Sequence, residues 1–378
     1  MIKEYYKKDG TKQYMFVAYL GVDPLTGKQK RTTRRGFNTE REAKIAEAKL
    51  LTEISNNGFS QHSNSTFKAV YELWFETYQT TVKESTAWKT KQIFDKHILP
   101  AFGNIKIKDI TVGHVQKTLN AWAKSYSKFR TFLNYTSKIF KFAINLSLLN
   151  YNVCDRVMLP KSKTKKKVNN YYNKEQLQAF FQAWEKEDNL MHQTYFRLLA
   201  YTGMRKSETL ALKWTDLNLN DHTVSIDKTV TIGENDLVII SETPKNSHSE
   251  RILDIDKETI NLLSRWRKEQ KKLLLMDGHN SLNTEQLIFS NQNNEALHPC
   301  HVSNVLNRFI KRHALDAITP HGFRHTHCSL LLEAGVPIKE VQERLGHSDI
   351  KTTMNIYAHV TKKEELETGS KFANFMSI

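Results

Sequence analysis

Four short segments in the second half of the sequence hold side chains that can handle a phosphate group. Two of the segments contain an arginine, one contains a lysine, and the last has a histidine ten residues before a tyrosine. They are TGMRKSE (202–208), TPKNSHS (243–249), HGFRHT (321–326) and LGHSDIKTTMNIYAH (345–359). Taken singly, each of these side chains is more often a solvated or structural group, so only their combination points to chemistry.

The combination suits attack on a phosphodiester. Two arginines can hold the two non-bridging oxygens through paired hydrogen bonds and a fixed charge. A tyrosine hydroxyl can attack phosphorus to form a phosphotyrosine ester, and histidines and a lysine can donate hydrogen bonds or move protons. A lysine on a mobile hairpin is suited to protonating the leaving sugar oxygen. The six candidate residues are Arg205, Lys245, His321, Arg324, His347 and Tyr357.

The segment HGFRHT contains no acidic residue beside Arg324. A metal site would favour carboxylate or thiolate ligands, and a salt-bridged helix would place acids near the arginine. We therefore expect Arg324 to face a phosphate, in a reaction that uses no metal ion. Fixed cationic donors of this kind stabilise a transition state by on the order of 3 kcal/mol each.

The charge of the chain supports a polyanionic partner. The 378 residues carry 56 Lys and Arg against 40 Asp and Glu, a net charge of +16. Residues 1–63, 64–160 and 161–171 have net charges of +5, +8 and +5, whereas residues 172–378 have −2. Such a balance favours nucleic acid or an anionic membrane surface. Because the excess positive charge lies in residues 1–171, we expect this part to bind the partner and the remaining residues to perform the chemistry.

Other features narrow the class of protein. The three cysteines form no C-x-x-C pair, which predicts a reducing compartment without disulfides or a zinc module. The polar start MIKEYYKKDG and the lack of a run of ~20 apolar residues predict a soluble, cytoplasmic protein without a membrane partner. No GxxxxGK[ST] or GxGxxG loop occurs, so we expect no cofactor.

The first half of the chain is predicted to contain two small domains. In residues 1–58, apolar alternation in KQYMFVAYLG and the basic run KQKRTTRRGF predict strands, and Thr39 with Glu42 marks the start of a helix to about residue 56. Residues 64–158 show helical spacing of apolar residues and predict a bundle of about four helices. The lysine-rich residues 159–172 are expected to be an extended linker.

Residues 173–378 are predicted to form a larger, mostly helical domain with a small antiparallel sheet. Strands are expected in HTVSIDKTV (222–230) and on both sides of a hairpin around residues 244–249, within 236–255. Helices are expected around both arginine segments, where His321 and Arg324 share a face because they are three residues apart. The whole chain is thus expected to be a multidomain α+β protein.

The four segments, in this order and at these spacings, resemble the tyrosine recombinases, or phage-type integrases, over roughly residues 173–360. The resemblance implies that Arg205 and Arg324 clamp the scissile phosphate and that Tyr357 is the nucleophile. It further implies that Lys245 is the general acid, that His321 is the base, and that His347 donates a hydrogen bond to the phosphate. Lys228 is a rival for the lysine role, but it lacks the TPK…S context.

The resemblance extends, less sharply, to the rest of the chain. Residues 64–158 are similar to the core-binding domain that clamps DNA together with the catalytic domain. Residues 1–58 resemble the arm-type DNA-binding domain, a three-stranded sheet plus helix, of integrases from temperate phages and conjugative transposons. The implied activity is site-specific recombination through a 3′-phosphotyrosine and a Holliday junction, without ATP. The implied partners are double-stranded DNA at core and arm sites, a homotetramer, a host DNA-bending protein and an excisionase.

Two other functions fit part of the sequence. A DNA-binding regulator that has lost catalysis would keep the basic first half but need not keep all six candidate residues. A type IB topoisomerase would use the same phosphotyrosine chemistry as a monomer. The separate domain at residues 1–58 and the integrase-like segments favour the integrase.

Overall fold

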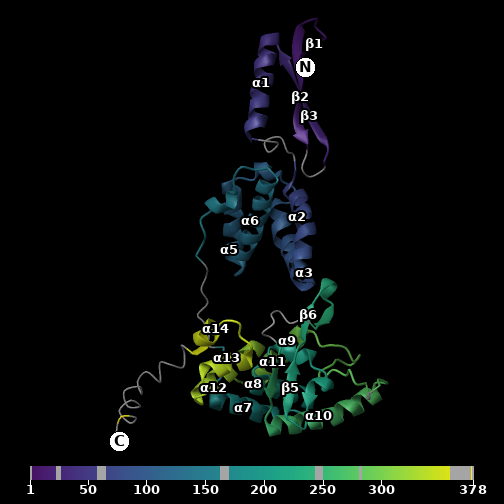
Figure 1. The fold of residues 1–378 in the computed structure, drawn as a ribbon, viewed down its shortest axis with the longest axis vertical. Helices are drawn as coiled ribbons and strands as arrows, with labels where there is room; N and C mark the ends of the chain where they lie inside the picture. Colours follow the sequence, from purple (N-terminus) through teal and green to yellow (C-terminus); the bar gives the residue numbers. More distant parts are fainter. Residues whose placement is uncertain are drawn as a thin grey trace. The chain divides into compact units, whose positions relative to one another are not determined.

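A computed structural model describes residues 2–22, 27–57, 65–161, 170–242, 250–280, 283–357 and 376, without the side chains of 53–57, 352 and 355–357. Contacts along the chain divide it into two compact units, residues 1–166 and 167–378. Both units mix helices with small antiparallel sheets (Figure 1). The fold is therefore multidomain α+β, as the sequence predicted. Among the described residues, no helix combines the length and apolar character needed to cross a membrane.

The N-terminal part is a three-stranded antiparallel sheet with one helix against it (Figure 1). The alternation predicted for the second strand is present, because Phe16, Ala18 and Leu20 are buried while their neighbours are more exposed. The Thr39 hydroxyl accepts the backbone N–H of Glu42, as the predicted helix start requires. The elements are β1 Ile2–Tyr6, β2 Lys12–Val22, β3 Gln29–Phe37 and α1 Glu40–Asn57, in sheet order β1-β2-β3.

The other described residues of the first unit are mainly helical. Its core is rich in phenylalanine. The ring centre of Phe67 lies 5.8 Å from those of both Phe102 and Phe140. The apolar residues predicted at helical spacing thus include aromatic rings that pack in the core. The elements are α2 Phe67–Thr81, α3 Glu84–Ile93, the π-helical η2 Phe94–Ile98, α4 Leu99–Phe102, η3 Ile107–Asp109, α5 Val112–Ser125, α6 Phe129–Asn145 and η4 Val153–Arg156.

The second unit is built mainly of helices, and α8 and α12 pack against each other within it (Figure 1). Many residues of both helices are buried, and α14 packs on α12 and α13. The helices are α7 Lys174–Trp184, α8 Leu190–Thr202, α9 Lys206–Ala211, α10 Lys257–Met276, α11 Pro299–Arg312, α12 Pro320–Glu333, α13 Ile338–Leu345 and α14 Ile350–Tyr357, with η5 Trp214–Asp216 and η6 Glu234–Asp236.

The strands of the second unit pair differently from the prediction. The stretch 222–230, predicted as one strand, contributes to two strands in separate sheets. The described strands on either side of residues 243–249 do not pair with each other, because β7 pairs with β6 and β8 pairs with β5. The expected hairpin partners were therefore wrong. The strands are β4 Leu217–Asn218, β5 Thr223–Ile226, β6 Thr229–Ile232, β7 Val238–Ser241 and β8 Arg251–Asp254.

Candidate active site

Arg324 lies in the interior of the second unit, on α12, with only 1% of its surface exposed. Its Nη1 donates to the carbonyl of Gly203 at 2.9 Å and its Nη2 to the carbonyl of Leu345 at 2.5 Å, while its Nε donates to Nε2 of His347 at 3.3 Å. Burial and the nearby charge of Arg205 lower the pKa of Arg324 to about 9, so it stays charged at neutral pH. Within the described part of the chain no carboxylate pairs with it.

Arg205 immediately precedes α9 and faces the same region. The chain enters this position through Gly203, whose φ of +65° lets α8 end in a left-handed turn. The Nη1 of Arg205 donates to Oε1 of Glu208 at 2.6 Å, and its Nη2 donates to the carbonyl of Gly346 at 3.1 Å. A guanidinium has five N–H donors, so these two bonds leave Arg205 with N–H groups for a ligand.

Glu208 is a buried carboxylate and is not among the six predicted residues. Its second oxygen, Oε2, accepts from Nη2 of Arg251 at 2.9 Å. Burial alone would raise the pKa of Glu208, but the charges of Arg251 and Arg205 outweigh it and lower that pKa. Glu208 is therefore an anion that joins Arg205 to Arg251. Its spacing of three residues from Arg205 on a helix was the signal for the first pairing; no local pattern predicts the second.

His347 follows α13 and is hydrogen-bonded to Arg324. Its Nε2 accepts from Arg324, so the ring proton sits on Nδ1 and is donated to Oγ1 of Thr353, 2.9 Å away on α14. Burial and the positive charges of Arg324 and Arg205 lower the pKa of His347 to about 3. His347 is therefore a neutral imidazole, and its Nε2 is occupied by the hydrogen bond from Arg324.

A cavity of about 450 Å³ opens beside these groups. Two of the predicted residues, Arg205 and His321, line it; Arg324 and His347 do not. The remaining lining residues carry mostly hydroxyl and ammonium groups and are Lys206, Ser207, Thr229, Ser303, Thr319 and Pro320. Partial desolvation, His325 and the charge of Arg324 lower the pKa of His321 to about 4. His321 is thus a neutral imidazole able to accept a proton.

The lysine and the tyrosine of the prediction are only partly described. Lys245 lies outside the described residues. Tyr357 is the last residue of α14, and only its backbone is described. The rival Lys228 is largely buried, and its ammonium is 2.8 Å from carboxylate oxygens of both Asp216 and Asp227. Lys228 thus holds two acids in place.

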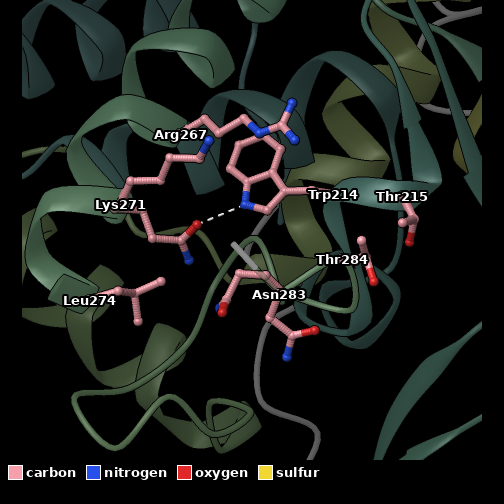
Figure 2. Close-up of a pocket in the computed structure, with 9 residues that line it drawn as sticks. Trp214, Thr215, Arg267, Lys271, Leu274, Asn283 and Thr284 are labelled. Carbon is pink, nitrogen blue, oxygen red and sulfur yellow. Dashed lines mark hydrogen bonds between the residues drawn. The ribbon is translucent and has the colours of Figure 1, made fainter. Parts of the chain in front are cut away.

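A second cavity, of about 180 Å³, lies elsewhere in the unit, between η5, α10 and residues 283–286. Figure 2 shows the Trp214 indole inside it, hydrogen-bonded through Nε1 to the buried Gln270 side chain at 2.7 Å, with Arg267 over the ring. None of the six predicted residues lines it. Across the described ranges, no group of three or more His, Cys, Asp or Glu side chains is placed to hold a metal ion.

Comparison with known proteins identifies the family. Residues 170–364 match the phage integrase family, residues 66–123 the phage integrase N-terminal SAM-like domain, and residues 4–54 an arm DNA-binding domain. The first match alone covers more than half of the chain. The chain therefore belongs to the phage integrase family of tyrosine recombinases, which are site-specific DNA recombinases.

Individual relatives agree with this assignment over nearly the whole chain. The ICEBs1 integrase of Bacillus subtilis is 28% identical over 374 residues, covering 98% of this chain and 99% of that protein. The prophage ps2 probable integrase of Lactococcus lactis is 29% identical, covering 90% and 92%. The predicted family resemblance is thus confirmed.

Solved structures show the same fold. The Tn1549 transposon integrase in complex with transposon right end DNA has a TM-score of 0.66 at 20% identity, covering 82% of this chain and 100% of that one. A lambda integrase tetramer bound to a Holliday junction has a TM-score of 0.57 at 18% identity, covering 93% and 94%.

Proposed function

We propose that this chain is the integrase of a mobile DNA element, and that it cuts and rejoins DNA through a 3′-phosphotyrosine on Tyr357 without a metal ion or ATP. The freed 5′ hydroxyl attacks the partner duplex, and two successive strand exchanges pass through a Holliday junction. The energy of each broken bond is stored in the phosphotyrosine ester, so the reaction needs no nucleotide. The relatives that match along the chain carry names of integrases from such elements.

One observation carries the proposal: three arginines lie near a single buried carboxylate, Glu208, and only two of them pair with it. Arg205 and Arg251 both pair with Glu208, while Arg324 has no acidic partner among the described residues. A cluster with this excess of positive charge is costly to bury unless an anion completes it. A phosphodiester supplies that anion and offers two oxygens to the N–H groups that Arg205 and Arg324 have left.

A bound phosphate would also change the protonation of the two histidines. Its negative charge raises the pKa of a neighbouring imidazole. His321, neutral in the DNA-free state, is placed to accept the proton of the attacking hydroxyl. His347 becomes a donor to the phosphate once its Nε2 leaves Arg324. Because Arg324 is almost fully covered, we propose that DNA binding shifts the side chains above it and completes the site.

The remaining parts of the chain are assigned to DNA binding and assembly. We propose an arm-type domain at residues 1–58, a core-binding domain at 64–158, a basic linker at 159–172 and the catalytic domain at 173–378. The lambda structure contains a tetramer on a Holliday junction, and we propose the same assembly here. Binding of arm and core sites by one chain requires bent DNA, so a host bending protein and an excisionase are the proposed partners.

The test is covalent trapping. The protein is incubated with a nicked duplex that carries the candidate core site from the DNA flanking its coding sequence, and denaturing gels follow the products. Wild type should form a covalent protein–DNA band, and Tyr357→Phe should form none. Salt-sensitive binding of this duplex without any covalent band would instead support a catalytically silent DNA-binding regulator. Relaxation of supercoils by a monomer, without exchange between duplexes, would support the topoisomerase.

A further inference from the structure

The C-terminal end of α13 is a meeting point for three arginines from three different elements. Nε of Arg251, from β8, donates to the carbonyl of Arg344 at 2.9 Å. Arg324, from α12, and Arg205, from the start of α9, donate to the next two carbonyls, those of Leu345 and Gly346, at 2.5 and 3.1 Å. The last carbonyls of a helix lack partners within the helix and carry its negative partial charge. Three guanidinium groups satisfy them here.

Arg251 closes a ring within this cluster. Its Nη2 donates a hydrogen bond to Oε2 of Glu208, and Nη1 of Arg205 donates one to Oε1. The two arginines are thus fixed both to one carboxylate and to carbonyls of the same chain segment, those of Arg344 and Gly346. Without Arg251, Glu208 would keep only its two bonds to Arg205, from the backbone N–H to Oε2 at 2.9 Å and from Nη1 to Oε1 at 2.6 Å, and would lose its link to β8.

We infer that Arg251 is a positioning residue for strand cleavage: it locks Glu208 and the end of α13 so that Arg205 and Arg324 present their remaining N–H groups to the scissile phosphate. The inference rests on the proposed function and deepens it. The Arg251 side chain is only 8% exposed and Glu208 only 6%, so neither is placed to bind DNA directly. Arg251 acts through Arg205 and through α13, and its effect should appear in the chemical step.

The arrangement also links the arginines to the segment that carries the nucleophile. The chain leaving α13 passes through Gly346, in a left-handed conformation with φ of +64°, and then His347 to α14. Tyr357 is the last residue of α14. Anchoring the end of α13 at three consecutive carbonyls therefore fixes the point from which the nucleophile helix departs.

The experiment compares Arg251→Gln and Arg251→Lys with a matched control, Arg197→Gln, in the full chain. Arg197 is also poorly exposed and pairs with two carboxylates, Asp256 and Glu258, but it belongs to no part of the cluster. Single-turnover covalent trapping on the nicked duplex gives the cleavage rate, and gel shift gives the affinity. Arg251→Gln should cleave about 10²-fold more slowly with affinity unchanged within about twofold, because small misplacements of catalytic groups cost rates of this order. Arg251→Lys should recover part of the rate, and Arg197→Gln should behave like wild type.

A second readout separates positioning from general damage. A methylphosphonate at the scissile position replaces one charged oxygen by a methyl group, so less positive charge is needed there. If Arg251 works by placing Arg205 and Arg324, the deficit of Arg251→Gln should shrink at least tenfold on this substrate. A deficit of equal size on both substrates, or cleavage by Arg251→Gln equal to that of Arg197→Gln, would overturn the inference. Absence of a covalent band in wild type would instead refute the proposed function.

Discussion

The Nε of Arg324 donates to Nε2 of His347 at 3.3 Å, and this bond fixes which nitrogen of the histidine carries its proton. The proton on Nδ1 is then donated to Oγ1 of Thr353, which is fully buried on the helix that ends at Tyr357. A chain of two hydrogen bonds thus joins a buried arginine to α14, the helix that ends at Tyr357. It depends on the neutral form of His347, which burial and the charges of Arg324 and Arg205 favour by lowering the pKa of that residue to about 3.

Removal of the Thr353 hydroxyl should therefore slow strand cleavage. Thr353→Val keeps the volume but leaves the Nδ1–H of His347 without an acceptor, a loss of about 1–3 kcal/mol for a buried donor. We expect covalent complex formation to fall at least tenfold while DNA affinity is unchanged, and Thr353→Ser to restore it. Equal cleavage rates for the valine and serine variants would show that the hydroxyl does not orient His347.

The general acid can be assigned with a sulfur-substituted substrate. If Lys245 protonates the leaving 5′ oxygen, Lys245→Ala should cleave ordinary DNA at least 10²-fold more slowly, within the usual range for a general acid. A sulfur atom at that bridging position leaves as a thiolate and needs no proton, so the variant should regain most of its rate. Lys228→Ala removes an ammonium engaged by Asp216 and Asp227 and serves as the control. Recovery by Lys228→Ala and not by Lys245→Ala would exchange the two assignments.

Cleavage should persist without metal ions or nucleotides. In the proposed chemistry, Arg205 and Arg324 supply the positive charge that a metal ion supplies elsewhere, and the phosphotyrosine stores the bond energy. Dialysis against EDTA, followed by trapping on the nicked duplex without ATP, should leave the single-turnover rate within about twofold of the untreated protein. A loss of rate that added Mg²⁺ restores would contradict the metal-free mechanism, provided that DNA affinity is unchanged by the treatment.

The stability of the second unit should fall below about pH 6.5 because of His327. This buried ring donates from Nδ1 to the carbonyl of Ala200 and accepts at Nε2 from Arg344. Burial, followed by the charge of Arg344, lowers the pKa of His327 to about 3. The folded state therefore binds this proton less readily than the unfolded state, so stability is complete above the unfolded pKa and is lost as the pH falls towards 3. At pH 5 the loss amounts to about 2 kcal/mol.

Urea unfolding at pH 7.5 and pH 5.0 measures this effect. His327→Gln should be less stable than wild type at pH 7.5, but its stability should drop by about 2 kcal/mol less between the two pH values. The same drop in both proteins would mean that His327 titrates with an ordinary pKa in the folded state.

The helices that carry the candidate residues were predicted correctly from the sequence. A helix starts directly after Arg205 and another carries both His321 and Arg324, because turn residues and apolar spacing act over a few neighbours. Arg324 donates to the backbone carbonyls of Gly203 and Leu345 instead, which no pattern near it predicted. The roles of the six candidates, and the placement of Lys245, stay predictions.

Pairing between residues far apart in the sequence could not be predicted from local patterns. Alternation located strands but not their partners, so β7 and β8 were assigned to each other although they pair with β6 and β5. In the same way, Arg251 lies 43 residues from Glu208 and 93 from Arg344, and no periodicity connects them. The cluster exists because three elements pack around the end of α13, which is a property of the tertiary fold.

Gly203 offers a test of how tightly that fold holds the arginines. A Cβ there would come within 2.7 Å of both His327 and Leu345, whose carbonyl accepts from Arg324. Gly203→Ala combines this clash with a left-handed backbone, φ +65°, and should destabilise the protein by about 2–4 kcal/mol. Gly335→Ala is the matched control, because its φ is +85° but a Cβ would meet nothing within 4 Å. Calorimetry should show a larger loss for Gly203→Ala, and the same variant should cleave DNA more slowly under conditions where it remains folded. Equal losses in both variants would mean that α13 yields to the added methyl group and that the arginines tolerate its movement.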